Sequence, residues 1–367
     1  MRLYIAGGCG EHGRNSFLLE EGQKGILVDC GLIHGRESSY PQLTHEKIGN
    51  INYLFLTHSH KDHTGAVKWL IQEGFNGKII ASRETYDQML YKPDNVICLH
   101  KSSGNILLEK DLSVEYGKSG HCEGALWYII CWKQNKILFS GDYCETSEIY
   151  KCDKLRGKKV NVALLDCAYG YDETGSQNSY VEFYQEIVHW VKKDKNVLLP
   201  VPKYGRGEDI IKGLLKYEEI SMVAEECLIE QCKRNKNFSQ EDISELMKYD
   251  GEILNGSNVY LICDPQLEKI ESRQFATQFI IRKDKIIMSG NIEEDSYSKM
   301  LYDCNAVSQK RFYVHQNLKE VRNLISQNSF DKIILTHSKV KFQTNDIKGK
   351  LIPLLTGEEL FFSSSIS

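Results

Sequence analysis

The chain has 367 residues, which exceeds one typical domain, so we expect two domains or one domain with a large insertion. Its net charge of −4 excludes a general attraction to nucleic acid, so a polyanionic substrate must be held by local basic groups or by metal ions. No apolar stretch is long enough to span a membrane, no export signal is visible, and the twelve cysteines are scattered, so we expect a protein of the reducing cytoplasm.

Three short apolar segments open the chain, at residues 3–8, 16–20 and 25–31. Glycines separate them, and this pattern predicts three strands joined by turns. Asp29 lies at the end of the third segment. Its carboxylate either accepts a hydrogen bond from a metal-bound imidazole or makes an Asx turn, and the sequence leaves both open.

A seven-residue segment at 57–63 carries three histidines and an aspartate. The apolar stretch 51–57 predicts a buried strand before it, and 64–71 has the apolar spacing of a helix. The segment therefore lies at the C-terminal end of a strand, where open α/β sheets bind ligands. The first two histidines can converge on one ion, and the following aspartate and histidine point toward a second. The alternative is a polar loop in which the aspartate caps the helix. The predicted ligands are His58, His60, Asp62 and His63.

The next part of the chain supplies two more candidate ligands. Predicted strands and one helix follow at residues 77–81, 84–90 (the helix), 112–116, 126–132 and 136–142. His121 is flanked by glycines just before a strand, so a metal ion can reach it without crowding. Asp142 ends an apolar strand, which is the arrangement of a bridging carboxylate. Either residue alone is weak evidence, but after residues 57–63 both support a binuclear metal site.

These motifs resemble the metallo-β-lactamase fold, whose pattern is H-x-H-x-D-H followed by a distant histidine and a distant aspartate. Residues 162–170 and 197–208 are similar to the acidic signature and to the strand, proline and Gly-Arg segment of the β-CASP nucleases in that superfamily. Residues 313–320 and 331–338 resemble the family's later histidine motifs. A histidine at position 337 resembles the RNA-directed branch, which includes ribonuclease J and the cleavage-and-polyadenylation endonuclease.

The resemblance implies an α/β fold, a metallo-β-lactamase αββα sandwich with an inserted α/β β-CASP domain. The sandwich would comprise residues 1–168 and 306–367, and the insertion residues 169–305. We expect the following elements in the insertion: helices at 177–193 and 208–233, then strands at 258–263, 278–282 and 285–289. Two closing strands are expected at 351–355 and 359–362, with no accessory RNA-binding domain at either end.

The resemblance also implies two Zn²⁺ ions, with Mn²⁺ or Fe as alternatives. One ion would be held by His58, His60 and His121, and the other by Asp62, His63 and His337, with Asp142 bridging them. The implied reaction is hydrolysis of phosphodiester bonds in single-stranded RNA by a hydroxide that bridges the two zinc ions. DNA is an alternative substrate, and a homodimer is left open.

Three residues have implied catalytic roles, Asp62, Asp166 and His315. His315 would donate a hydrogen bond or proton to the phosphate or leaving oxygen, and Asp166 would orient it. Substrate contacts are expected at Tyr169, at Ser289 and at Arg206.

The interpretation of Arg206 and of the whole chain has alternatives. The guanidinium can clamp a phosphate, or it can form a salt bridge to Glu208 or Asp209. The chain can also be a small-molecule metallo-hydrolase of the same fold. A third hypothesis is a non-catalytic scaffold subunit for nucleic-acid processing.

Overall fold

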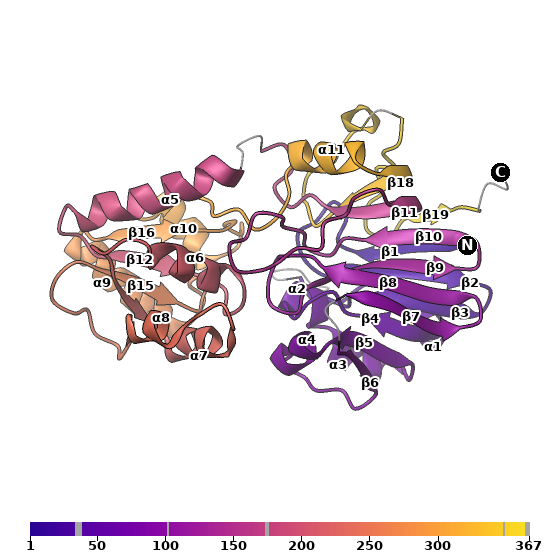
Figure 1. The fold of residues 1–367 in the computed structure, drawn as a ribbon, viewed down its shortest axis with the longest axis horizontal. Helices are drawn as coiled ribbons and strands as arrows, with labels where there is room; N and C mark the ends of the chain where they lie inside the picture. The colour runs from indigo at the N-terminus through magenta and orange to yellow at the C-terminus, as the bar shows by residue number, and fades with distance from the viewer. Residues whose placement is uncertain (34–38, 101–102, 173–175, 348, 364–367) are drawn as a thin grey trace. The chain divides into compact units, whose positions relative to one another are not determined.

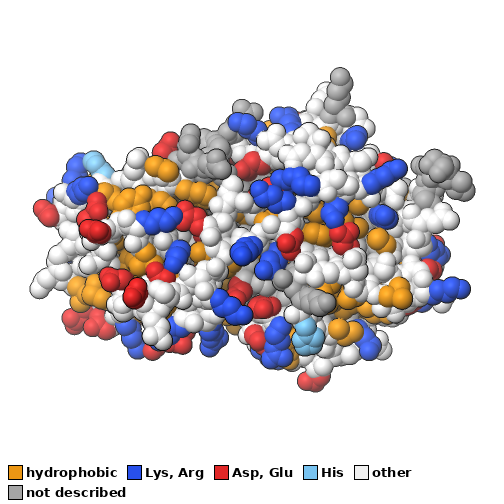
Figure 2. Space-filling view, viewed as in Figure 1, with side chains coloured by type: hydrophobic (Ala, Val, Ile, Leu, Met, Phe, Trp, Pro, Cys, Tyr) orange, Lys and Arg blue, Asp and Glu red, His pale blue; other side chains and the backbone are white. Residues whose placement is uncertain are grey.

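The computed structural model describes residues 1–33, 39–100, 103–172, 176–347 and 349–363, and Figure 1 shows their secondary structure. The chain divides into two units. Unit 1 comprises Met1–Glu145, Lys151–Glu173 and His315–Ser367, and unit 2 comprises Thr146–Tyr150 and Thr174–Val314. On the face drawn in Figure 2, acidic and basic side chains are interspersed, as expected for a chain with a small net charge. Among the described residues, no helix combines the length and the apolar character needed to cross a membrane.

Unit 1 contains two mixed sheets. The first consists, in spatial order, of β19 (Glu359–Phe361), β1 (Arg2–Gly7), β2 (Ser16–Glu21), β3 (Lys24–Val28), β4 (Ile51–Phe55), β5 (Lys78–Ser82) and β6 (Val96–Leu99). The second consists of β18 (Ser329–Thr336), β11 (Lys159–Asp166), β10 (Asn135–Phe139), β9 (Leu126–Trp132), β8 (Leu112–Lys118) and β7 (Gly104–Glu109). The helices are α1 (His45–Gly49), α2 (Lys61–Thr64), α3 (Val67–Gln72), α4 (Arg83–Gln88) and α11 (Leu318–Ser326), with the 3₁₀ turn η1 (Thr344–Asp346).

Successive side chains of a strand point to opposite faces of its sheet, so each sheet can turn one apolar face to the other sheet. In β9, Tyr128 and Ile130 lie in a core cluster with Phe55 of β4, between the sheets. The outer face of the first sheet packs against α3 and its neighbours, and the outer face of the second packs against α11. These four layers confirm the predicted α/β sandwich.

Unit 2 contains one sheet in which all recorded strand pairs are parallel. Its spatial order is β14 (Leu246–Lys248), β13 (Ser221–Ala224), β15 (Asn258–Ile262), β12 (Val197–Pro200), β16 (Lys285–Met288) and β17 (Ser308–Gln309). Its helices are α5 (Ser176–Val191), α6 (Arg206–Leu214), α7 (Glu226–Arg234), α8 (Gln240–Ser244), α9 (Ile270–Arg282) and α10 (Tyr297–Asp303).

Several predicted elements are wrong. The helix expected at 208–233 is α6, β13 and α7, because Met222, Val223 and Ala224 are buried as a central strand. The strand expected at 278–282 is the last part of α9, where Phe279 packs into the core. Residues 351–355 make only an isolated bridge at Leu351. Strands β6 and β7 were not predicted; most of their residues are only partly buried or exposed.

The main segment of unit 2 is Thr174–Val314, whereas the insertion was predicted at 169–305. Leu318 donates its backbone N–H to the carbonyl of Gly170 at 2.8 Å, which keeps residues 169–172 with unit 1. At the other boundary, β17 pairs with β16, and Phe312 packs on Phe183 in unit 2. The chain therefore returns to unit 1 only at His315.

Candidate metal centre

The candidate ligands lie at strand ends in unit 1. His58 to His63 follow β4, and His60 is the N-terminal cap of α2. The strands β10, β11 and β18 are parallel neighbours, and Asp142, Asp166 and His337 lie at or just beyond their C-terminal ends. Because the ends of parallel strands meet at one edge of a sheet, the fold brings side chains together that are far apart in the sequence.

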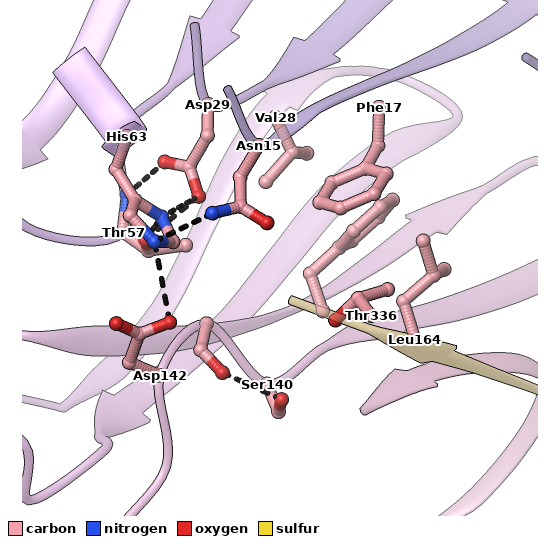
Figure 3. Close-up of a pocket in the computed structure, with 12 residues that line it drawn as sticks. Asn15, Phe17, Val28, Asp29, Thr57, His63, Ser140, Asp142, Leu164 and Thr336 are labelled. Atoms are coloured by element: carbon pink, nitrogen blue, oxygen red, sulfur yellow. Dashed lines mark hydrogen bonds and ion pairs between the residues drawn. The ribbon is translucent and has the colours of Figure 1, made fainter. Parts of the chain in front are cut away.

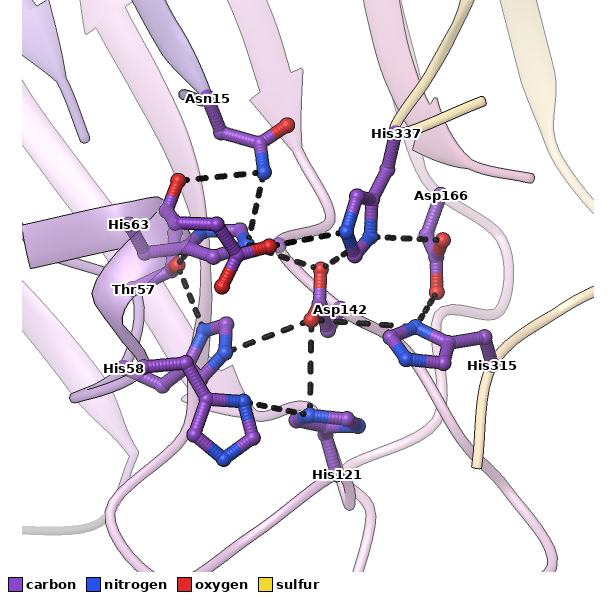
Figure 4. Close-up of polar contacts among 12 residues, drawn as sticks. Asn15, Thr57, His58, His63, His121, Asp142, Asp166, His315 and His337 are labelled. Atoms are coloured by element: carbon purple, nitrogen blue, oxygen red, sulfur yellow. Dashed lines mark hydrogen bonds and ion pairs between the residues drawn. The ribbon is translucent and has the colours of Figure 1, made fainter. Parts of the chain in front are cut away.

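The first cluster contains His58, His60, His121 and Asp142, whose ligand atoms all lie within 4.8 Å of one another. Asp142 Oδ2 is 3.3 Å from His58 Nε2 and 3.4 Å from His121 Nε2. His121 Nε2 is 3.2 Å from His60 Nδ1. Figure 4 shows the rings of His58 and His121 turned toward the Asp142 carboxylate from different segments.

The second cluster contains Asp62, His63 and His337, again within 4.8 Å of one another. His337 Nε2 is 3.0 Å from Asp62 Oδ2. The other oxygen of Asp142, Oδ1, is 3.2 Å from His63 Nε2 and 3.0 Å from His337 Nδ1. Asp142 thus presents one oxygen to each cluster, which is the arrangement of a bridging ligand.

Three imidazole nitrogens support metal binding. His58 Nε2 and both ring nitrogens of His337 are buried, and none makes a hydrogen bond of regular geometry to a described residue. Buried polar atoms are otherwise almost always satisfied, so these nitrogens fit an added ligand. The donor set of imidazoles and carboxylates suits Zn²⁺ and also accepts Mn²⁺ or Fe. The two clusters can therefore hold metal ions.

The electrostatics of the centre depend on its buried charges. Burial lowers the pKa of His58, His60 and His121, which keeps these imidazoles neutral as ligands must be. Burial also opposes charge on His63 and His337, but the carboxylates around them, Asp142 first, raise the pKa of both well above its usual range.

Asp29 contacts the candidate ligand His63. Its Oδ2 lies 2.7 Å from His63 Nδ1, and its Oδ1 accepts the backbone N–H of Thr57 at 2.8 Å. The Thr57 hydroxyl also donates to Oδ2 at 2.8 Å. Of the two interpretations of Asp29, the structure contains the carboxylate–imidazole contact, which directs Nε2 of His63 toward the second cluster. Figure 3 shows the small cavity that Asp29, Thr57 and His63 line.

We expect Asp29→Asn to lower metal affinity about 10–100-fold, because the neutral amide no longer fixes the His63 ring. A metal titration against a competing chelator measures the effect. The matched control is Asp87→Asn, whose carboxylate pairs with Arg83 on the exposed face of α4. Equal affinity for the two variants would contradict the orienting role.

His315 forms a pair with Asp166 beside the two clusters. Its Nδ1 is 3.1 Å from Asp166 Oδ2, and its side chain is 12% exposed. Asp166 is fully buried, and its carboxylate accepts backbone N–H groups from Tyr143 and Ala168, each at 3.0 Å. Burial raises the pKa of Asp166, but the His315 and His337 imidazoles together outweigh this and lower it overall. The carboxylate stays ionised and holds the imidazole.

The loop that carries His315 is anchored by the start of α11. The Asn317 side chain accepts the Glu320 backbone N–H at 2.9 Å, and the Glu320 carboxylate accepts the Asn317 N–H at 3.1 Å. This is a capping box, which satisfies two helix N–H groups. It gives Asn317 a structural role immediately after the pair.

Replacing the cap, Asn317→Ala, should lower the free energy of unfolding by about 1 kcal/mol. Urea unfolding followed by circular dichroism measures it. Asn323→Ala, an exposed position on the same helix, is the control and should change stability little. An unchanged unfolding midpoint for Asn317→Ala would show that the cap contributes nothing.

The predicted substrate contacts are divided between the units. Tyr169 in unit 1 lies edge-on to His315, with 5.4 Å between ring centroids. Arg206 and Ser289 belong to unit 2. Arg206 begins α6 and packs on Gly290, where an added Cβ would lie 2.4 Å from Nη1. Ser289 is fully buried, and its hydroxyl donates to Pro200 O at 3.4 Å.

The carboxylates that competed for Arg206 have other partners. Glu208 accepts the Gly205 N–H at 3.1 Å and the Asn235 amide at 3.2 Å. Asp209 accepts the Glu148 N–H at 3.3 Å. Their contacts hold the start of α6 and its neighbours within unit 2.

Two residues near the centre were missed by the sequence analysis. The His12 ring stacks on His337, with centroids 4.4 Å apart, and Asn15 Nδ2 lies 2.9 Å from His63 Nε2. Both belong to the glycine-rich turn between β1 and β2. The sequence does place polar residues in that turn, but their spacing does not indicate that they lie near a metal site.

Comparison with known proteins identifies the first part of the chain. Residues 9–183 match the family model for the Metallo-beta-lactamase superfamily. A solved structure of a protein of unknown function from Enterococcus faecalis V583 is similar over 98% of this chain and 99% of that one, with a TM-score of 0.63 and 12% identity. That likeness supports the fold.

Curated relatives match at low identity. Transcription termination factor FttA of Methanothermobacter thermautotrophicus is 23% identical over 61% of this chain and 41% of that protein. Ribonuclease TTHA0252 of Thermus thermophilus is 23% identical over 58% and 54%, respectively. Endoribonuclease YSH1 of Candida albicans is 23% identical over 59% and 29%. The matched region thus spans about half or less of each relative. The family match, together with the fold, shows that this chain contains a metallo-beta-lactamase domain.

Proposed function

We propose that the chain is a metal-dependent nuclease of the β-CASP type that hydrolyses phosphodiester bonds in single-stranded RNA. The proposal rests mainly on the position of Asp142. Its carboxylate faces both ligand clusters and lies beside the His315–Asp166 pair. Relatives named as ribonuclease and endoribonuclease support RNA as the substrate. The inserted unit with its Gly205–Arg206 segment supports a large substrate over a small one.

We infer a pair of ions, and zinc is favoured by the donor set. His58, His60 and His121 would hold one, and Asp62, His63 and His337 the other, with Asp142 between them. When bound, such ions activate a water molecule for attack and neutralise charge on phosphoryl oxygens.

The protein side chains then serve three purposes. The ligands position the reacting groups, and Asp29 keeps His63 in the required orientation. His315 donates a proton or hydrogen bond to the leaving oxygen, a contribution of about 10²–10⁴-fold. Asp166, buried and ionised, holds His315 by its Nδ1, so that Nε2 is directed to the substrate.

Arg206 is the proposed phosphate clamp, and Tyr169 and Ser289 are further proposed contacts. A guanidinium binds two phosphate oxygens at once, and such charge-assisted bonds contribute about 1.5–3 kcal/mol. We expect Arg206→Ala to raise KM for RNA about 10–100-fold with metal content unchanged. Arg282→Ala, which removes a surface guanidinium of the same unit, should leave KM unchanged. If both variants keep the original KM, Arg206 is not a clamp.

One assay separates the candidate functions. Labelled single-stranded RNA and DNA with different 5′ ends, and a small thioester and lactone, are incubated with the metal-loaded chain. The proposal predicts cleavage of RNA that a chelator stops. Hydrolysis of the small esters alone would favour a small-molecule hydrolase, and RNA binding without any cleavage would favour a scaffold.

A further inference from the structure

Two cysteines lie together at the C-terminal ends of two neighbouring strands in unit 2. Strands β13 and β15 are parallel neighbours whose register ends at Ala224↔Leu261, and Glu225 N donates to Leu261 O at 3.0 Å. Cys227 lies in the first turn of α7, and Cys263 directly follows β15. The parallel register thus joins cysteines that are 36 positions apart.

The two thiols are close enough to react with each other. Cys227 Sγ lies 2.9 Å from Cys263 Sγ. A disulfide has sulfurs about 2.05 Å apart, so forming the bond needs a movement of about 0.9 Å. The Glu225 carboxylate accepts the Cys263 N–H at 3.1 Å and lies 3.5 Å from Cys227 Sγ, which fixes both segments.

Solvent can reach both thiols, whereas several other cysteines of the chain are buried. Cys227 and Cys263 are partly exposed, whereas Cys9, Cys30 and Cys167 are buried and burial raises the pKa of each. The sulfur–sulfur contact with Cys263 lowers the pKa of Cys227 and outweighs burial and the Glu225 carboxylate, which both raise it; the positive charge of Lys203 lowers it further. The shared hydrogen correspondingly raises the pKa of Cys263.

Thiolate character decides which cysteine reacts first, because the thiolate is the nucleophile. Cys227 is therefore the attacking residue and Cys263 the resolving one, an arrangement common to redox-sensitive cysteine pairs. Neither belongs to the ligand clusters of unit 1, so this chemistry is independent of the proposed nuclease function.

We propose that Cys227 and Cys263 form a modification site that a peroxide converts to an intramolecular disulfide. The Cys227 thiolate attacks one oxygen of hydrogen peroxide, and the O–O bond breaks to give a sulfenic acid and hydroxide, which takes up a proton to form water. Cys263 sulfur then attacks Cys227 sulfur, the S–O bond breaks, and the leaving oxygen departs as a second water with the Cys263 proton. Two thiols lose two electrons, and the peroxide gains them.

The test treats the full chain with hydrogen peroxide, alkylates the remaining thiols and maps the peptides by mass spectrometry. We expect a linked Cys227–Cys263 peptide with two hydrogens fewer than the separate peptides, and a reductant should release it. Cys227→Ser and, independently, Cys263→Ala should each abolish the linked peptide. Cys304→Ser removes an exposed cysteine of the same unit and should leave it unchanged.

Two outcomes would overturn the proposal. One is that peroxide oxidises Cys304 while Cys227 and Cys263 are still recovered as separately alkylated residues. The other is that the protein carries a further metal ion that Cys227→Ser removes and that prevents oxidation. The Glu225 carboxylate and the two sulfurs would then be a metal site, since their ligand atoms also lie within 4.8 Å of one another.

Discussion

Asp142→Asn should abolish RNA cleavage, with a loss of about 10³-fold or more in kcat. The carboxylate presents Oδ1 to one cluster and Oδ2 to the other, at 3.0–3.4 Å from the imidazole nitrogens of both. An amide is neutral and offers one good acceptor, so it cannot satisfy both clusters. We also expect elemental analysis to find less metal bound than in the unchanged chain.

The matched control for this prediction is again Asp87→Asn, an exposed carboxylate whose surface ion pair contributes little. It should keep full activity and full metal content. If Asp142→Asn retained both as well, Asp142 would not be a bridging ligand, and the two clusters would not form one centre.

His315→Ala should reduce kcat about 10²–10⁴-fold while leaving the metal content unchanged. The ring is held by Asp166 at 3.1 Å and lies outside the first and second clusters, although its ligand atom lies within 4.8 Å of those of Asp142, Asp166 and His337. A proton donor that acts on the leaving group contributes to the chemical step and not to metal retention. Single-turnover cleavage together with elemental analysis separates the two effects.

The control is His45→Ala, since the His45 side chain is 81% exposed and pairs with Glu73 outside both clusters. Loss of metal from His315→Ala would make His315 a ligand, because its Nδ1 also lies 3.7 Å from Asp142 Oδ2. Unchanged kcat would remove it from the mechanism.

Candidate ligands could be predicted from the sequence because more than half of the set is local. His58, His60, Asp62 and His63 are close in the chain, and their spacing alone indicates a metal site. Asp142 was predicted at the end of an apolar strand, His121 between glycines just before a strand, and His337 from the resemblance to the family's last histidine motif. The parallel arrangement of β10, β11 and β18 is what brings those ends together.

The residues that support the ligands were harder to infer. Asp29 contacts His63 across 34 positions, and two equally ordinary uses of an aspartate after a strand were open. His12 and Asn15 lie in a turn whose glycines predict only a change of direction. Such contacts depend on which strands are neighbours, and local patterns do not encode that.

The wrong secondary-structure predictions in unit 2 have a similar cause. The segment at 221–224 is short and lies between two helices, so its apolar residues fit one long helix equally well. Its position between β14 and β15 gives it the buried environment of a strand. Conversely, 278–282 is rich in residues that favour strands, but packing of Phe275 and Phe279 on one helical face decides its structure.

The most direct measurement is cleavage of labelled single-stranded RNA by the chain as purified without chelator, after metal removal, and after addition of Zn²⁺. We expect cleavage in the first state, none in the second, and recovered cleavage in the third. The Asp142→Asn variant should show no such recovery. Cleavage that persists after the metal has been removed, or no cleavage of RNA by the metal-loaded chain, would contradict the proposed function.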